Sequence, residues 1–220
     1  MKANINIHKV YKPFFRFFRK KRMKKFIETF NPDEDTIILD VGGSPLIWEL
    51  TNIKSKITLL NIQIPQISGS YLHDYYFVKG DGCSLNYNNR YFDIAFSNSV
   101  IEHVGTYTDQ VKFAKEIRRV GKKIWVQTPS RNFIIEPHLI TPFIHFILPL
   151  FSMKYQKYLL KNFTVWGLIA RPTSKQINDF LNNTRLLNYT EMKKLFPDCE
   201  IYKEKIFFLT KSYIAIRNNF

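Results

Sequence analysis

The chain has little cysteine, with only Cys83 and Cys199 among its 220 residues. Two cysteines are too few for a disulfide framework, and they lack the close spacing of a metal site. We therefore expect no structural metal. We also expect the protein to fold in a reducing compartment, because it does not depend on disulfides. A cytoplasmic location follows from this, and contact with the inner membrane surface is a further expectation.

Long apolar runs are missing as well. The most apolar stretch, Leu139–Phe151, is shorter than the roughly 20 residues of a membrane-spanning helix, and Pro142 and Pro149 interrupt it. Near the N-terminus, phenylalanines alternate with arginines and lysines, so no apolar core of a secretory signal can form. Neither an integral membrane protein nor a secreted one is expected.

Acidic residues are scarce, and the formal net charge is +15. The first acidic residue is Glu28, so Pro13–Phe30 is predicted to be a basic amphipathic helix within an N-terminal segment, residues 1–35. Such a charge is compatible with nucleic acid, anionic lipid and acidic substrates as partners, and with peripheral membrane contact through residues 11–30. Nucleic acid is not the favoured partner. Two alternatives stay open: a coding bias toward Ile, Lys and Asn, and a helix that packs its Phe face on the domain.

Short apolar runs alternate with helical patterns from residue 36 onward. This alternation predicts a doubly wound, mostly parallel α/β sheet within one domain, residues 36–220. The alternation of strands and helices is interrupted at about 130–172, and we interpret this stretch as an insertion that covers the substrate. The predicted strands are 36–41, 57–62, 75–79, 91–97 and 123–128, followed by a hairpin of 200–208 and 210–217, and the predicted helices include 107–120, 173–187 and 191–196.

Two segments at predicted strand ends carry the chemistry. The strand Thr36–Val41 runs into Gly42-Gly43, a turn in which backbone can approach a ligand closely. About 20 positions on, where dinucleotide-binding folds place a ribose-binding residue, the sequence has Asn61 in place of the usual acid. Any strand-to-helix turn can contain two glycines, so the turn alone is also consistent with a purely structural role.

The ordered set of segments is more specific. After Leu59-Leu60-Asn61 come Gly80–Leu85, which reads GDGCSL, and Phe92–Val104, which reads FDIAFSNSVIEHV. In this order they resemble the class I S-adenosylmethionine-dependent methyltransferase superfamily, in its small-molecule, methyltransferase type 11-like branch. The resemblance covers about residues 36–128. It implies a Rossmann-like, seven-stranded, mostly parallel sheet with helices on both faces, a C-terminal antiparallel hairpin, and S-adenosyl-L-methionine as the cofactor.

The resemblance also implies a set of cofactor-binding residues. The glycine turn would lie near the methionine part, Asn61 near the ribose, and Asp81 near the adenine amino group. Gly82 and Cys83 would lie against the adenine ring. The full set is Asp40, Gly42, Gly43, Asn61, Asp81, Gly82, Cys83, Ser97 and Asn98.

A general base is needed only where the methyl acceptor must lose a proton. His103 is a candidate because it follows the fourth predicted strand, and Glu136 and His138 in the insertion are alternatives. Glu102 and these three residues could equally have structural roles in loops and turns.

The expected activity is methyl transfer to an O or N nucleophile of a small-molecule or lipid/glycan-linked acceptor. An RNA methyltransferase is one alternative, and the charge supports it. The Asn/Asp-Pro-Pro-aromatic segment of base-amino methyltransferases is absent, since Ser97–Val100 stands in its place. The other alternative is a membrane-surface binding protein with a lapsed methyltransferase fold.

Overall fold

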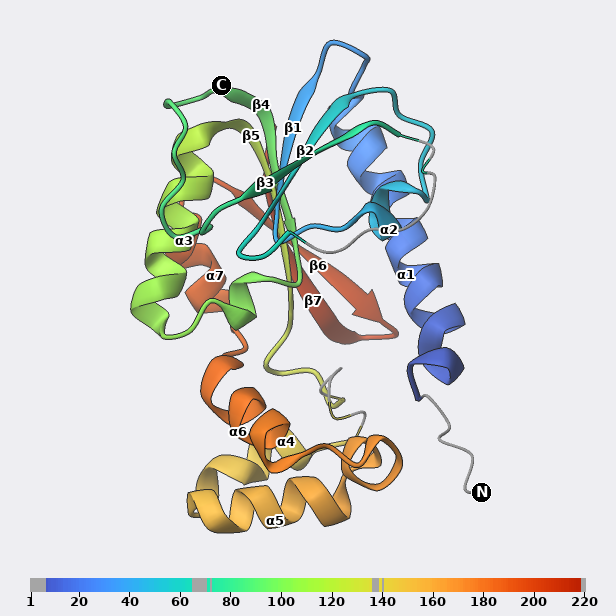
Figure 1. Ribbon diagram of the computed structural model, residues 1–220, viewed down its shortest axis with the longest axis vertical. Coiled ribbons are helices and arrows are strands. Elements are labelled where there is room, and N and C mark those ends of the chain that lie inside the picture. Colours follow the sequence, from blue (N-terminus) through green and yellow to red (C-terminus); the bar gives the residue numbers. More distant parts are fainter. Residues whose placement is uncertain (1–6, 65–70, 72, 136–138, 140, 219–220) are drawn as a thin grey trace.

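A computed structural model gives the fold and describes residues 7–64, 71, 73–135, 139 and 141–218, with side chains from residue 16 onward. Its centre is a seven-stranded sheet in the order β3-β2-β1-β4-β5-β7-β6 (Figure 1). The strands are β1 (Ile37–Val41), β2 (Lys56–Asn61), β3 (Tyr75–Lys79), β4 (Phe92–Asn98), β5 (Gly121–Pro129), β6 (Glu200–Ile206) and β7 (Leu209–Arg217).

The first five strands pair in parallel, whereas β7 runs antiparallel to both β5 and β6. The carboxyl ends of β1 to β5 therefore lie along one edge of the sheet. The strand order also reverses between β1 and β4, and ligands of open α/β sheets bind at such a reversal. The predicted fold class, including the C-terminal hairpin, is confirmed.

Alternate residues of the strands point to opposite faces, and each face has its own apolar core. One face packs on α3 and α7, through residues such as Phe113, Ile117 and Met192. The other packs on α1 and α2, through Trp48 among others. The helices outside the insertion are α1 (Ile7–Phe30), α2 (Pro45–Trp48), η1 (Ile101–His103), α3 (Tyr107–Val120) and α7 (Tyr189–Leu195).

Helix α1 begins at Ile7, so the prediction that Pro13 is its first residue was wrong. Proline at an inner position costs a backbone hydrogen bond, which is why the sequence favoured a start there. The second half of α1 inserts Met23, Phe26 and Phe30 into the core. The ring centroid of Phe26 lies 5.3 Å from that of Phe96. The alternative of a Phe face packed on the domain is therefore confirmed for this half.

The insertion predicted at about 130–172 is part of a small helical cap, which the described residues 139 and 141–183 form and which lies at the lower end of Figure 1. It has a separate apolar cluster, which includes Leu139, Leu148, Leu160 and Ile177. Its elements are α4 (Ile144–Ile147), η2 (Leu148–Leu150), α5 (Met153–Phe163), η3 (Trp166–Ala170, a π-helical turn) and α6 (Ser174–Asn183). The predicted capping box of Thr173 and Gln176 starts α6.

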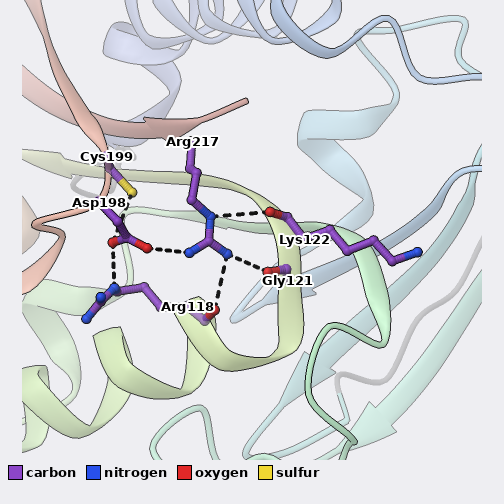
Figure 2. A network of polar contacts seen from close by, with 6 residues as sticks. All are labelled: Arg118, Gly121, Lys122, Asp198, Cys199 and Arg217. Carbon is purple, nitrogen blue, oxygen red and sulfur yellow. Dashed lines mark hydrogen bonds and ion pairs between the residues drawn. The ribbon is translucent and has the colours of Figure 1, made fainter. Parts of the chain in front are cut away.

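A polar network ties the sheet together at the opposite, amino edge (Figure 2). Arg217 of β7 donates to the carboxylate of Asp198 and to the backbone oxygens of Arg118, Gly121 and Lys122. Arg118 of α3 donates to the same Asp198 carboxylate at 2.6 Å, and these two arginines lower the pKa of that carboxyl group. This network joins α3, β5 and β7 at the end of the sheet away from the carboxyl ends of β1 to β5.

Candidate functional site

A cavity of about 550 Å³ opens at the carboxyl ends of β1 to β4. This volume lies within the usual range for small-molecule sites. The walls come from the strand ends, from η1 and from α3. The lining residues are Val41, Gly42, Leu60, Asn61, Ile62, Gln63, Gly80, Asp81, Gly82, Cys83, Val100, His103, Val104, Asp109, Lys112 and Phe113.

The glycine turn after β1 forms one wall of the cavity. Gly42 has a φ of +74°, and a Cβ on it would lie 2.6 Å from Cγ2 of Val100. Its N–H donates to the carbonyl of Leu60 at 2.7 Å, which fixes the turn against β2. A side chain is therefore excluded here twice, by backbone conformation and by Val100.

Asp40 lies beneath this turn, fully buried, and does not line the cavity. The indole Nε1 of Trp48 donates to its Oδ2 at 2.8 Å, while Oδ1 has no hydrogen-bond partner among the described residues. Burial raises the pKa of Asp40 to about 7, and the Trp48 hydrogen bond acts in the opposite direction. A Cβ on Gly43 would lie 1.9 Å from Oδ2, so the turn rests directly on this carboxyl group.

The next two strand ends supply the polar groups of the cavity. The side-chain amide of Asn61, after β2, donates to the carbonyl of Gly43 at 2.9 Å. Asp81, after β3, is exposed, and its Oδ1 accepts from the N–H of Cys83 at 2.8 Å. A Cβ on Gly82 would lie 2.7 Å from both Phe113 and Val41, so glycine allows the backbone of this turn to pack on the core.

Two of the predicted residues at the end of β4 lie outside the cavity lining. Ser97 is buried and donates to the carbonyl of Val41 at 3.0 Å. Asn98 accepts from Arg22 of α1 at 2.6 Å. Arg22 also pairs with the buried Glu204 at 2.7 Å, and Glu204 in turn lies 3.3 Å from Lys211. The side chain of Asn98 therefore belongs to a buried charge cluster that holds α1 on the sheet.

Of the three candidate bases, His103 lies in the cavity wall and is exposed. Glu136 and His138 lie outside the described residues. Glu102 is fully buried and accepts from the hydroxyl of Thr128 at 2.9 Å, which joins η1 to the end of β5. His103 is thus the candidate base that the described cavity contains.

Sequence reasoning missed the wall formed by α3. Asp109, Lys112 and Phe113 are spaced three and four residues apart, so they lie on one face of the helix. Lys112 lies 3.2 Å from Asp109 at the cavity rim. The helical spacing of these residues was the available sequence signal for this wall. It was missed because the residues do not follow a predicted strand.

A larger groove of about 1150 Å³ lies elsewhere, between α1 and the loop of residues 50–54. Its walls include Lys20 and Lys24 of α1, and Asp33 and Lys54, which precede β1 and β2. Asp33 and Lys54 mark the amino ends of these strands. Cofactors of α/β sheets bind at the carboxyl ends, so the smaller cavity is the candidate cofactor site.

Solved structures share this fold. The PH0226 protein of Pyrococcus horikoshii has 14% identity and a TM-score of 0.56, with 93% of this chain and 90% of that one covered. A Rhodobacter sphaeroides protein named as a Zn-dependent alcohol dehydrogenase has 11% identity, a TM-score of 0.58, and coverage of 88% and 86%. The magnesium protoporphyrin IX methyltransferase of Synechocystis, solved with S-adenosylhomocysteine, has 9% identity, a TM-score of 0.50, and coverage of 90% and 81%. At these identities the likeness shows the fold alone.

Among curated proteins no sequence matches the chain. The family model of a methyltransferase domain matches residues 50–123, from the loop before β2 into β5. About a third of the chain is therefore similar to a methyltransferase domain. The matched segment contains Asn61, Asp81, Gly82, Cys83 and His103, which all line the cavity. The domain match indicates S-adenosylmethionine as the cofactor.

The polar groups that line the cavity suit this cofactor. An amide at the end of β2 and a carboxylate at the end of β3 suit hydroxyl and amino groups, and the carboxylate of Asp81 is accessible. The side-chain-free turn at Gly42 leaves backbone exposed to the cavity. Among the described residues, no group of three His, Cys, Asp or Glu side chains could hold a metal ion.

Proposed function

We propose that this chain transfers a methyl group from S-adenosylmethionine to an O or N nucleophile of a small-molecule or lipid/glycan-linked acceptor. One observation carries the proposal. The cavity at the strand-order reversal between β1 and β4 brings together Gly42, Asn61, Asp81, Gly82 and Cys83, which the methyltransferase resemblance assigns to the cofactor.

Each predicted cofactor-binding residue has a role in this proposal. Asn61 binds the ribose through its amide, while Asp81 accepts from the adenine amino group. The backbone of Gly82 and Cys83 lies against the adenine ring. Gly42 lies near the methionine part, beside Val100 in the cavity wall. Asp40 acts from beneath by supporting Gly43, and Ser97 and Asn98 act by holding β4 to β1 and α1.

The cofactor supplies a methyl group activated on a sulfonium, so the transfer is a displacement in which positioning contributes much of the rate. In this proposal His103 holds the proton that a hydroxyl or amine acceptor loses. Its exposed ring on η1 borders the cavity, and histidine changes charge near neutral pH. The cap covers the acceptor, since it continues from β5 at the carboxyl edge. We also propose a cytoplasmic location with peripheral membrane contact.

The proposal predicts that Asp81→Asn weakens S-adenosylhomocysteine binding by roughly tenfold, because a charge-assisted hydrogen bond is worth about 1.5–3 kcal/mol. Asparagine keeps an oxygen for the N–H of Cys83, so the local turn should survive. Asn61→Ala should weaken binding to a similar extent. Isothermal titration calorimetry on the full chain measures both.

Asp179→Asn is the matched control, because Asp179 is an exposed carboxylate on α6 in the cap. It should bind the ligand as the wild type does. Equal affinities for Asp81→Asn, Asn61→Ala and Asp179→Asn would contradict the assigned roles. Failure of the wild type to bind would contradict the proposed function itself.

A further inference from the structure

The cap and the tip of the β6–β7 hairpin expose an unusual amount of apolar surface. Phe207 and Phe208 at the hairpin tip are each 88% exposed, and Leu150 in the cap is 79% exposed. Phe163, Leu168 and Ile169 are exposed as well. Single exposed apolar residues are normal on proteins, but apolar side chains gathered over neighbouring elements mark an interaction site. We call these six residues the docking surface.

Cationic residues outnumber acidic residues in the cap part of the docking surface. No Asp or Glu occurs between Glu136 and Asp179 in the sequence. The same stretch has five cationic residues, Lys154, Lys157, Lys161, Arg171 and Lys175. Lysine is depleted in protein–protein interfaces, whereas lysine interleaved with aromatic residues is typical of surfaces that lie on anionic membranes.

The parts of the docking surface adjoin one another through α1. The π-helical turn η3, which contains Leu168 and Ile169, contacts both α1 and α5. The hairpin packs on α1 as well, since Lys211 lies 4.0 Å from the centre of the Phe18 ring. Figure 1 shows the N-terminal half of α1, in dark blue, beside the hairpin and above the level of the cap. Helix α1 adds further cations there and has no acidic residue before Glu28.

We propose that the docking surface binds the face of an anionic lipid bilayer. The apolar side chains enter the interfacial region, and the lysines of the cap and of α1 contact lipid phosphates. Within the described residues no helix is long and apolar enough to cross a bilayer, so the binding is peripheral. The proposal rests on the exposure of apolar side chains and on the charge of the surface, and it does not require methyl transfer. Binding in this way would turn the carboxyl edge of the sheet toward the membrane, where a lipid-linked acceptor lies.

The test is flotation of the full chain with phosphatidylcholine vesicles, with and without phosphatidylglycerol. The wild type should float with the anionic vesicles, and added salt should reduce the bound fraction because surface charge attraction is screened. Phe207→Ser with Phe208→Ser should lower the partition coefficient by about a hundredfold or more, because two aromatic side chains no longer enter the lipid. Leu168→Ser with Ile169→Ser should act in the same direction.

Matched controls separate local from general effects. Val111→Ser removes an apolar side chain that is 44% exposed on α3, outside the cap and the hairpin, and should float as the wild type does. Lys154→Gln with Lys161→Gln should lower anionic binding by about tenfold, since each cation near such a surface contributes about a fivefold factor before screening. Lys193→Gln with Lys194→Gln on α7 removes the same charge and should have little effect.

Three results would overturn the proposal. The first is a wild type that stays with the soluble fraction on anionic vesicles. The second is binding that the hairpin and η3 variants leave unchanged. The third is a dimer that the same variants dissociate, as measured by analytical ultracentrifugation, because a second copy would then occupy the docking surface.

A separate outcome concerns nucleic acid. If the wild type does not float but binds short RNA in a salt-dependent way, and these variants abolish that binding, the surface would be assigned to nucleic acid. Calorimetry with S-adenosylhomocysteine on each variant separates this outcome from failure of the proposed function.

Discussion

Raising the pH from about 5 to about 8 should cost the wild type roughly 2–3 kcal/mol of stability through Asp40. Its pKa in the folded chain is about 7, against an ordinary value of 3.8, because the carboxyl group is fully buried. Between these two values the folded state holds a proton that the unfolded chain has lost. Stability from this group is therefore complete below about pH 3.8 and disappears as the pH rises through about 7.

Urea denaturation of the wild type and of Asp40→Asn at the two pH values measures this contribution. Asparagine keeps an acceptor for the indole of Trp48 but does not titrate. Carboxyl groups with lowered pKa values, such as Asp93 and Glu191, change stability in the opposite direction but at lower pH. A wild-type-minus-variant difference that stays constant from pH 5 to pH 8 would show that Asp40 does not titrate in this range.

Gly43→Ala should destabilise the fold by about 3 kcal/mol or more, through overpacking and a lost buried hydrogen bond. The new Cβ would lie 1.9 Å from Oδ2 and 2.0 Å from Cγ of Asp40. That carboxyl group cannot easily retreat, because it is buried and fixed by Trp48 at 2.8 Å. The turn at the cavity wall would have to move, so binding of S-adenosylhomocysteine should fall with stability.

Gly80→Ala, at the end of β3, is the matched comparison. Its Cβ would lie 3.0 Å from Cδ1 of Leu60, the far end of a flexible side chain, so the cost should stay below about 1 kcal/mol. Asp40→Ala combined with Gly43→Ala should be less destabilised than the sum of the two single variants, since the collision is then removed. Two variants of equal stability, Gly43→Ala and Gly80→Ala, would contradict the packing described here.

Local pattern predicted most of the sheet. The run at Tyr75–Lys79 and the helix Tyr107–Val120 match the structure at both ends. Strand β5 is longer than the predicted 123–128, since it begins at Gly121 and ends at Pro129. Strands buried on both faces have short apolar runs bounded by glycine or proline. This pattern is local in the sequence, so it can be recognised without the fold.

Other features depend on contacts between distant residues and left no local pattern. The bond from Trp48 to Asp40 and the pairing of Arg22 with Glu204 are of this kind, and the second turns Asn98 toward α1. The cap helices are short and are held by their own apolar cluster, so their composition predicted only the absence of strands. The wall formed by α3 likewise could not be predicted from the sequence, because only the tertiary fold brings α3 beside the strand ends.

Native mass spectrometry of the full chain with S-adenosylhomocysteine measures whether the cavity binds this cofactor. We expect one bound molecule per chain, with less of the bound form for Asp81→Asn and an unchanged amount for Asp179→Asn. Copurified S-adenosylmethionine or S-adenosylhomocysteine in the untreated sample would support the same conclusion. A folded chain whose mass stays unshifted at excess ligand would contradict the assignment of the cavity to this cofactor.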